Sequence, residues 1–194
     1  RVPAKKRLSS YIRRLAILSS TLALLIIVLT VLTFNKANEL MRVPAAPLDT
    51  FSSNILPAFT PVSFFSLDEQ TRLNGWFFTP RTPPVSTIVL VHDQGRNRLQ
   101  FGLDSADLYA HLLSLGYNVL AFDLRRSGQS GGEMSSFGYS EWADVLAAVR
   151  HARRNAVTRD VILFGFGTGT AASLLALDKL PPAGTVAAAN AGNP

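Results

Sequence analysis

The chain of 194 residues contains no cysteine, so disulfide bonds and thiolate chemistry cannot contribute to its fold or its function. Histidine is scarce, with three residues, and these do not cluster with acidic residues at the spacing of metal ligands. We therefore predict neither a metal site nor a bound cofactor.

An excess of one charge is also missing from most of the chain. The net charge of +6 arises within residues 1–14, and the remaining residues contain 13 basic and 13 acidic side chains. A nucleic-acid-binding domain carries its basic residues on the folded part of the molecule. We therefore expect no nucleic-acid partner.

Charge is absent altogether from residues 15–34, "LAILSSTLALLIIVLTVLTF". A helix of about 20 residues is about 30 Å long, which matches the thickness of a bilayer core. We predict a basic cytoplasmic tail at 1–14 and a transmembrane helix at 15–34 that contacts the lipid bilayer. A buried core helix is the alternative, and the length and the basic flank disfavour it.

The basic flank should stay on the cytoplasmic side, which predicts a single-pass membrane protein with its domain on the periplasmic or extracellular side. A cleaved signal peptide is the main alternative. It would have an apolar region of about 7 to 15 residues followed by a small-residue cleavage site, and "NKANELMRV" offers no such site. We favour an uncleaved signal anchor.

The remainder divides into a stalk and a domain. Residues 35–60 contain several prolines and predict an extended stalk, and 61–194 form the domain. The runs 61–67 and 72–78 predict an antiparallel hairpin. Further strands are expected at 86–91, 117–122, 160–166 and 184–190, with helices at about 104–115, 139–154 and 168–179. This alternation predicts an α/β fold with a mainly parallel, doubly wound sheet, whose ligands bind at the carboxyl ends of the strands.

Three loops that follow expected strands carry distinctive motifs: "VHDQG" (91–95), "DLRRSGQS" (123–130) and "GFGTG" (165–169). In this order they resemble the α/β-hydrolase superfamily, in particular its serine esterases, lipases and acyl hydrolases. The resemblance covers about residues 61–190. It implies a sheet of the α/β-hydrolase type that is incomplete at the C-terminus. The expected hairpin and the predicted transmembrane helix precede this sheet.

In the first loop the family commonly has His-Gly and a backbone that supplies part of the oxyanion hole. The resemblance therefore implies an oxyanion-hole-like backbone at Asp93 and Gln94, with Thr168 from the third loop. Asp93 stands where the family usually has glycine. Its carboxylate would repel an oxyanion if it faced the pocket. His92 is either part of this motif or a polar residue that ends the strand.

The second loop is similar to the family's Asp-x-Arg-Gly-x-Gly-x-Ser sequence. The family uses this segment as a structural turn. The resemblance therefore implies that Asp123, Arg125, Gly128 and Ser130 fix the loop through local hydrogen bonds and take no part in catalysis.

The third loop corresponds to the G-x-S-x-G elbow, with Gly165 and Gly169 as the flanking glycines and Gly167 in place of the nucleophile. Glycine cannot attack a carbonyl, but it adopts the strained backbone of such a turn at little steric cost. Thr168 lies one position too late to replace the serine. No histidine follows Gly167, and Asp178 is the one acidic residue after it, so no catalytic triad is intact in this sequence.

The same glycines also match a G-x-G-x-x-A dinucleotide fingerprint at 167–172. That motif belongs to the first strand–helix–strand unit of its fold, and an acidic residue about 20 positions later holds the ribose. Here the motif follows the third strand, and Asn190 stands at the end of the next one. A dinucleotide-binding domain is therefore the third alternative.

Two other functions fit the sequence better than dinucleotide binding. The sequence favours a catalytically inactive hydrolase-like domain that serves as an accessory or scaffolding subunit of a membrane complex. The alternative is a fragment or an inactivated form of a serine hydrolase that acts on carboxylic esters, thioesters or amides. Whether the protein is an enzyme stays open at this point.

Overall fold

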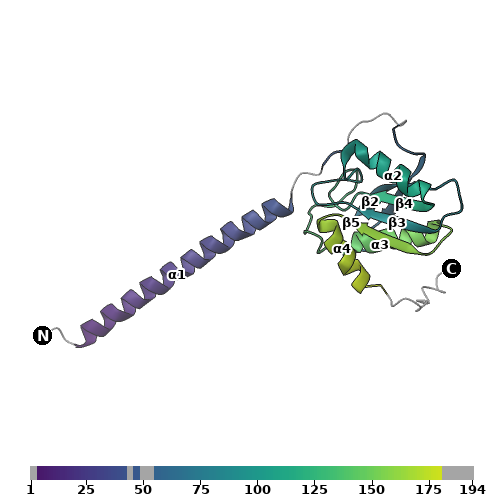
Figure 1. Cartoon of the computed structure of the whole chain (residues 1–194). Coiled ribbons are helices and arrows are strands. Elements are labelled where there is room, and N and C mark those ends of the chain that lie inside the picture. The colour runs from purple at the N-terminus through teal and green to yellow at the C-terminus, as the bar shows by residue number, and fades with distance from the viewer. Residues whose placement is uncertain (1–3, 43–45, 49–54, 181–194) are drawn as a thin grey trace. The chain divides into compact units, whose positions relative to one another are not determined.

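The structure, a computed structural model, describes residues 4–42, 46–48 and 55–180 (Figure 1). The chain divides into two units, residues 1–41 and 42–194. The first unit is one long helix, α1 (Ala4–Met41). The second is an α/β domain with β1 (Phe59–Phe65), β2 (Arg72–Phe78), β3 (Ser86–Val91), the 3-10 helix η1 (Gly102–Asp104), α2 (Ser105–Ser114), β4 (Tyr117–Phe122), α3 (Trp142–Asn155), β5 (Val161–Gly165) and α4 (Thr168–Asp178).

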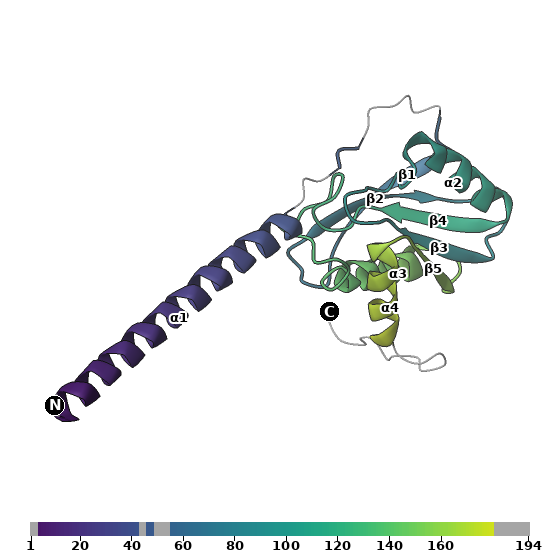
Figure 2. The same cartoon turned by 60° about the vertical axis from the view of Figure 1, so that its left-hand side comes forward.

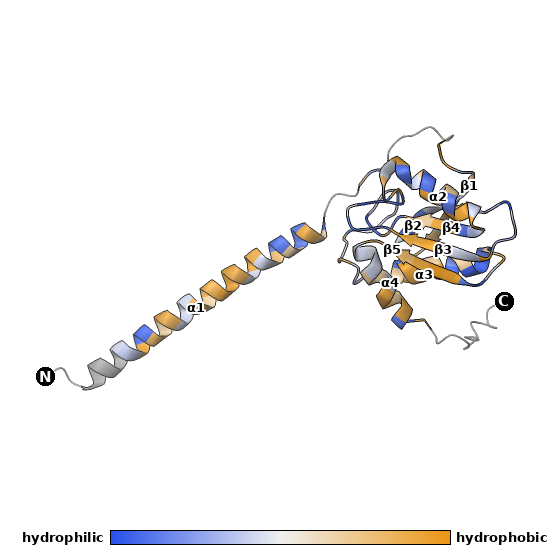
Figure 3. Cartoon of the chain, viewed as in Figure 1, coloured by the Kyte–Doolittle hydropathy of each residue, from blue (hydrophilic) through white to orange (hydrophobic). Residues whose placement is uncertain are grey.

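The helix α1 contains a segment, Ser10–Met41, that is long and apolar enough to cross a membrane. None of its most apolar stretch is buried against other residues, and Figure 3 shows this apolar middle. The expected span at 15–34 lies wholly inside α1. Among the described residues, one helix is therefore long and apolar enough to span a bilayer.

The helix is longer at both ends than the sequence predicts. Residues 4–14 of the expected tail and 35–41 of the expected stalk continue α1. No proline interrupts it before Pro44, the segment "NKANELM" is rich in helix-forming residues, and Lys36 pairs with Glu39 at 2.7 Å. An extended stalk therefore does not begin at residue 35.

The end of the expected stalk belongs to the domain. Leu56 is buried in the core on the side of α2. The Asn97 side chain donates a hydrogen bond to the Pro47 carbonyl at 2.9 Å, and β1 already begins at Phe59. Burial of apolar surface holds these residues on the domain, so the described part of 46–60 is not a free stalk.

The five strands form one sheet in the order β1-β2-β4-β3-β5. β1 pairs with β2 as the expected antiparallel hairpin, and β2 continues antiparallel to β4. β3 is parallel to both β4 and β5. Within the described residues β2 alone runs against the other strands, so the mainly parallel sheet is confirmed.

The helices cover both faces of the sheet, as Figures 1 and 2 show, with α2 on one face and α3 and α4 on the other. Successive strand side chains alternate between two apolar clusters, as the period of a strand requires. The cluster beneath α3 and α4 includes Val89, Val91, Leu120 and Phe122, and the cluster beneath α2 includes Ile88, Leu90, Val119 and Ala121. β3 and β4 are buried on both faces, which explains their mostly apolar sequences.

The chain leaves β3 toward β4 and later returns on the other side of β3 to form β5. The strand order therefore changes direction at β3, and the crevice beyond the carboxyl ends of β3 and β5 is the expected place for a ligand. Two of the motif loops, 91–95 and 165–169, meet there. The predicted strand 184–190 lies outside the described residues.

Candidate functional site

The turn between β5 and α4 contains the three glycines of the expected elbow. Gly167 has φ 51° and ψ −121°, in the region that L side chains rarely adopt. A side chain on Gly169 would collide with the backbone carbonyls of Val91 and His92, and one on Gly165 would collide with the backbone at Thr170. Glycine is therefore required for the close approach of α4 to β3, quite apart from any chemistry at the turn.

The side chain of Asp93 fills the space above this turn. Its Oδ1 atom accepts hydrogen bonds from the backbone N–H of Thr168 at 2.7 Å, the Thr168 hydroxyl at 2.9 Å and the backbone N–H of Gln94 at 2.8 Å. The Gln94 N–H also reaches the Thr168 oxygen at 2.8 Å. A carboxylate thus occupies the point on which the donors of the two loops converge.

The three hydrogen bonds determine the protonation of Asp93. Partial burial by itself would raise the pKa of its carboxyl group. The Thr168 backbone, the Thr168 hydroxyl and the Gln94 backbone outweigh this effect and hold the pKa of Asp93 below its ordinary value. The group is therefore a carboxylate at neutral pH.

Asp93 also supplies the N-terminal cap of α4. The N-cap position is Gly167, which has no side chain to accept a hydrogen bond from the first turn. The carboxylate of Asp93 accepts the N–H of Thr168 instead and places a negative charge at the positive end of the helix. This contact joins residues 75 positions apart in the sequence.

The structure brings together two of the three backbone groups that the sequence singles out. The N–H groups of Gln94 and Thr168 point to one atom. The N–H of Asp93 does not join them, because it donates to the Gln100 side chain at 2.8 Å. The contribution of Asp93 comes from its carboxylate.

His92 is buried and fastens this loop to the next one. Its Nδ1 lies 2.7 Å from the Asp93 carbonyl oxygen, and its Nε2 accepts the N–H of Leu124 at 2.9 Å. These partners require the neutral tautomer with the proton on Nδ1. Burial lowers the pKa of His92, which also favours the neutral ring. Both ring nitrogens are in use, so His92 is a structural residue of the loop.

Asp123 is fully buried beneath the second loop and pairs with the buried Arg98 at 2.6 Å. It also accepts the backbone N–H groups of Arg98 at 2.7 Å and Gln129 at 2.8 Å. Gly128 has a φ of 49°, and a side chain there would collide with the Asp123 carboxylate. The Ser130 hydroxyl donates to the Asp123 carbonyl at 2.7 Å.

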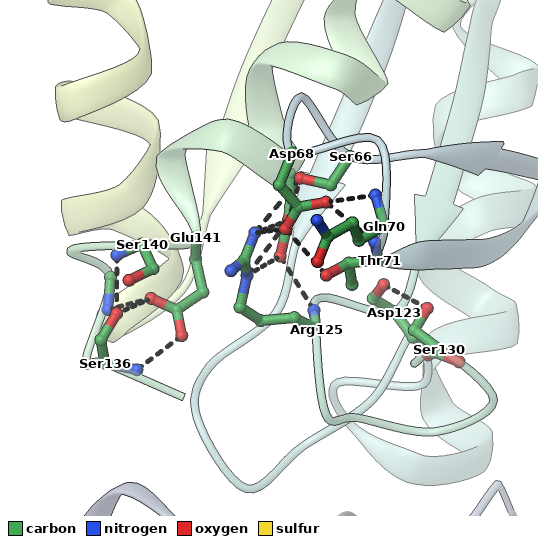
Figure 4. A network of polar contacts seen from close by, with 12 residues as sticks. Ser66, Asp68, Gln70, Thr71, Asp123, Arg125, Ser130, Ser136, Ser140 and Glu141 are labelled. Carbon is green, nitrogen blue, oxygen red and sulfur yellow. Dashed lines mark hydrogen bonds and ion pairs between the residues drawn. The ribbon is translucent and has the colours of Figure 1, made fainter. Parts of the chain in front are cut away.

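Arg125 connects the same loop to the hairpin and to α3, as Figure 4 shows for its neighbours Ser66 and Asp68. Its guanidinium lies 2.7 Å from the buried Asp144 and 3.2 Å from Asp68. Burial raises the pKa of Asp144, although Arg125 and Ser66 work against that rise. These contacts are structural hydrogen bonds and ion pairs.

Sequence reasoning did not single out three buried charged residues, Arg98, Asp144 and Glu141. Glu141 accepts the N–H groups of Ser136 at 2.7 Å and Gly138 at 2.9 Å, and Figure 4 shows it beside Ser136 and Ser140. The turn at these residues delays the start of α3 from the expected residue 139 to 142. A charged residue in a loop or an amphipathic helix has no sequence pattern that indicates burial. Only the fold therefore reveals that these three residues are buried and hydrogen-bonded.

A small cavity beside the turn, lined by His92, Tyr109 and Phe166 among others, has a volume of about 10 Å³, at the lower limit of the space that one water molecule needs. A larger cleft of about 500 Å³ lies between the end of β1 and α3, where Arg150 and Arg154 line it. No group of three acidic or histidine residues that could hold a metal ion occurs among the described residues.

Comparison with known proteins agrees with this architecture. The model of the alpha/beta hydrolase family matches residues 88–194. An uncharacterized protein of Bacillus subtilis, YqkD, is 32% identical over 129 residues, which cover 66% of this chain and 39% of that protein. The Pyrococcus furiosus esterase Pf2001 has a similar fold, with a TM-score of 0.62 and 24% identity over 71% of this chain and 54% of the esterase.

The Butyrivibrio proteoclasticus protein Est1E, solved with ferulic acid, is a further structural neighbour, with a TM-score of 0.53 and 17% identity over 61% of this chain and 47% of Est1E. The chain thus spans about half the length of these relatives, or less. The fold and the family match lead to one conclusion. The chain belongs to the alpha/beta hydrolase family.

Proposed function

We propose that this α/β-hydrolase domain is catalytically inactive and serves as an accessory or scaffolding subunit of a membrane complex. One observation carries the proposal. At the turn where the resemblance places the nucleophile, Gly167 has no side chain, and the carboxylate of Asp93 occupies the donors that would face an oxyanion.

The two features depend on each other sterically. A Cβ atom on Gly167 would lie far inside van der Waals distance of the Asp93 carboxylate. A side chain at residue 167 is therefore incompatible with the present position of the Asp93 carboxylate. The Asp93 carboxylate lies where a side chain at residue 167 would begin.

Electrostatics supports the same proposal. An oxyanion hole stabilises negative charge because its N–H dipoles are already aimed at the reacting oxygen. Here the N–H groups of Gln94 and Thr168 are already bonded to a full negative charge on Asp93. A second anion at that point would be repelled by the Asp93 carboxylate, and the two N–H groups could not donate hydrogen bonds to it.

The same contact weighs against the dinucleotide alternative. A pyrophosphate would need the N–H groups at the start of α4. Asp93 accepts the N–H of Thr168 there and adds a negative charge beside the turn. The hydrolase alternative, in which a longer or restored protein cleaves esters, thioesters or amides, is supported by the family match and requires changes at both Gly167 and Asp93.

Serine-hydrolase chemistry provides the direct test. The full chain in detergent is incubated with a fluorophosphonate probe and with short-chain nitrophenyl esters, and a serine esterase of the family serves as positive control. We expect no covalent labelling and no turnover above buffer. Labelling of the wild-type chain, traced to a residue of the described domain, would falsify the inactive assignment.

The membrane assignment has its own test, which the absence of cysteine makes simple. Val157 is 90% exposed on the domain, so Val157→Cys gives a single reporter for a membrane-impermeant maleimide on intact cells. We expect labelling of Val157→Cys and none of Ser9→Cys in the basic tail until the cells are lysed. The reverse pattern contradicts the proposed orientation.

The subunit role is tested by mild detergent extraction followed by native mass measurement at native expression level. We expect a defined complex in which the chain is present at fixed stoichiometry. Extraction as a lone chain under every mild condition removes the support for an accessory role, whatever the result of the probe experiment.

A further inference from the structure

The cleft between the hairpin and α3 is separate from the turn at Gly167. It has a volume of about 500 Å³ and is lined by the end of β1, the hairpin loop and one face of α3. None of its lining residues belongs to the loops 91–95 or 165–169. Pockets that hold small molecules commonly have volumes of about 300 to 1,000 Å³. The cleft is therefore large enough for a small ligand.

Much of the lining of this cleft is apolar. Phe64 stacks on the ring of His151, with the ring centroids 4.6 Å apart and the planes inclined by 20°. Phe65 follows it in β1 and is 57% exposed, and Leu67 and Ala147 add further apolar surface. A ligand that covered the Phe65 ring would remove apolar surface from water. The cleft therefore favours a ligand with a flat apolar body.

The α3 side of the cleft is basic. Arg150 and Arg154 line it one helical turn apart, on the same face of the helix. Both are exposed, and within the described part of the chain neither guanidinium forms an ion pair or a hydrogen bond. Two like charges at this spacing repel each other. A bound anion would relieve this repulsion and would accept hydrogen bonds from both groups.

His151, between the two arginines in sequence, is also short of an acceptor. Its Nδ1 lies 3.4 Å from the Asn155 amide nitrogen, which donates to the His151 carbonyl at 2.8 Å. Nδ1 is therefore on the acceptor side, and the proton of the neutral ring lies on Nε2. Burial lowers the pKa of His151, and Arg154 lowers it further, so the ring is neutral at pH 7. Nε2 is buried and has no hydrogen-bond partner among the described residues, which is rare for a native donor.

The charge balance of the cleft favours an anion with a single charge. Glu69 of the hairpin loop is the one acidic residue that lines it. Two arginines, one glutamate and a neutral histidine leave the cleft with one net positive charge. A guanidinium group also matches the geometry of a carboxylate, to which it can donate two parallel hydrogen bonds.

We propose that this cleft binds a small monocarboxylate with a flat apolar body, whose carboxylate contacts Arg150 and Arg154 and whose body covers the apolar lining. The site goes beyond the proposed function. It does not depend on whether the turn at Gly167 is catalytic, because the two places share no residue.

Direct binding tests the inference with 2-naphthoate as the probe. The full chain is held in nanodiscs of zwitterionic lipid at pH 7 and about 0.15 M salt, which screens charges farther away than about 8 Å. Titration calorimetry is corrected with empty nanodiscs. We expect saturable binding of one naphthoate per chain. Arg150→Gln and Arg154→Gln should each weaken it about tenfold, because each removes a charge-assisted hydrogen bond.

Arg153→Gln is the matched control. It removes the same charge from the same last turn of α3, at an exposed residue that does not line the cleft. Its dissociation constant should stay within about twofold of the wild type. Glu69→Gln should act in the opposite direction and tighten binding about twofold, because it removes a like charge beside the ligand.

Related probes test each part of the ligand. Acetate lacks the flat body, and 2-naphthalenemethanol lacks the charge. Each should bind at least about tenfold more weakly than naphthoate, because it loses either the apolar contact or the charge-assisted hydrogen bonds. The dianion 2-naphthyl phosphate should bind no more tightly than naphthoate, because its second charge faces Glu69.

The absence of saturable binding to the wild type overturns the inference. So do equal losses from Arg153→Gln and Arg154→Gln, or binding that persists when Arg150 and Arg154 are both replaced. All three arginines are exposed, so the variants should fold, and near-ultraviolet circular dichroism checks this. Fluorophosphonate labelling of the wild type overturns the proposed function and leaves this inference standing, whereas failed naphthoate binding does the opposite.

Discussion

Two loops at the carboxyl edge of the sheet differ in how they relate to the family that the chain belongs to. The Asp123 loop has the residues that the resemblance implies: Asp123, Arg125 and Ser130 form hydrogen bonds or ion pairs that hold this loop, and Gly128 leaves room for the Asp123 carboxylate. The turn at Gly167 has a positive φ between a strand and a helix, and the carboxylate of Asp93 accepts the N–H of Thr168 there.

The comparison separates what folding requires from what catalysis requires. Loss of the buried Asp123 would leave Arg98 without its counter-ion inside the protein, whatever the protein does. Loss of a nucleophile leaves no such defect, because glycine suits the turn and Asp93 satisfies the free N–H of Thr168. The proposed absence of hydrolytic chemistry is therefore compatible with the stability of this fold.

The largest expected effect lies in the structural loop. Asp123→Ala should lower the free energy of unfolding by about 3 to 5 kcal/mol, because it leaves the Arg98 guanidinium buried and unpaired. Denaturant unfolding monitored by tryptophan fluorescence measures the loss. Asp178→Ala, at a side chain that is 82% exposed, is the control and should change stability by less than about 0.5 kcal/mol. Equal effects of the two variants would contradict the structural assignment of this loop.

Gly167→Ser tests whether the turn can still accept a nucleophile. We expect a loss of about 1 to 3 kcal/mol, because the new side chain collides with Asp93 and the backbone φ of 51° is unfavourable for serine. In the background of Asp93→Gly the same substitution should cost at least about 1 kcal/mol less. Additive effects in this double-mutant cycle would show that the two positions do not compete for space.

Asp93→Asn tests the charge at the turn. The wild type should be more stable by about 1 to 2 kcal/mol at pH 7, because an amide makes weaker hydrogen bonds to Thr168 and Gln94. The pKa of Asp93 is depressed in the folded state, so its contribution is present above the unfolded-state value of about 3.9 and is lost as pH falls through the lower folded pKa.

Measuring the difference in stability between wild type and Asp93→Asn from pH 7 to pH 2 isolates this carboxyl group from Asp68 and Glu141, whose pKa values are also lowered. The difference should shrink toward acid pH. A difference that is constant over the whole range would refute the role of the ionised carboxylate.

The smallest effect is expected for Thr168→Val, which removes one donor to Asp93 and one acceptor for the Gln94 N–H. We expect a loss of about 1 kcal/mol by thermal or denaturant unfolding. Thr168→Ser retains the hydroxyl and should remain within about 0.5 kcal/mol of the wild type. If serine and valine destabilise alike, the hydroxyl is not the relevant group.

Much of the fold could be predicted from the sequence. The mostly apolar runs 86–91 and 117–122 became β3 and β4 with the expected bounds, because strands buried on both faces tolerate few polar residues. The stalk at 35–60 was predicted poorly, since α1 continues to Met41 and Leu56 is buried in the domain. Proline-rich composition does not reveal whether a segment finds apolar surface to cover.

The candidate site also has features that the sequence predicted and features that it could not predict. The glycines of the turn, and the absence of a nucleophile among them, are local facts of the sequence, because a residue without a side chain cannot acquire one through folding. The position of the Asp93 carboxylate is different. From the sequence its charge could face the pocket or point away, and only the packing of α4 against β3 brings Thr168 within 2.7 Å of it across 75 residues. Local chemistry therefore determined what this turn lacks, and the tertiary structure decided what fills it, because three converging hydrogen bonds require both loops to be held in place.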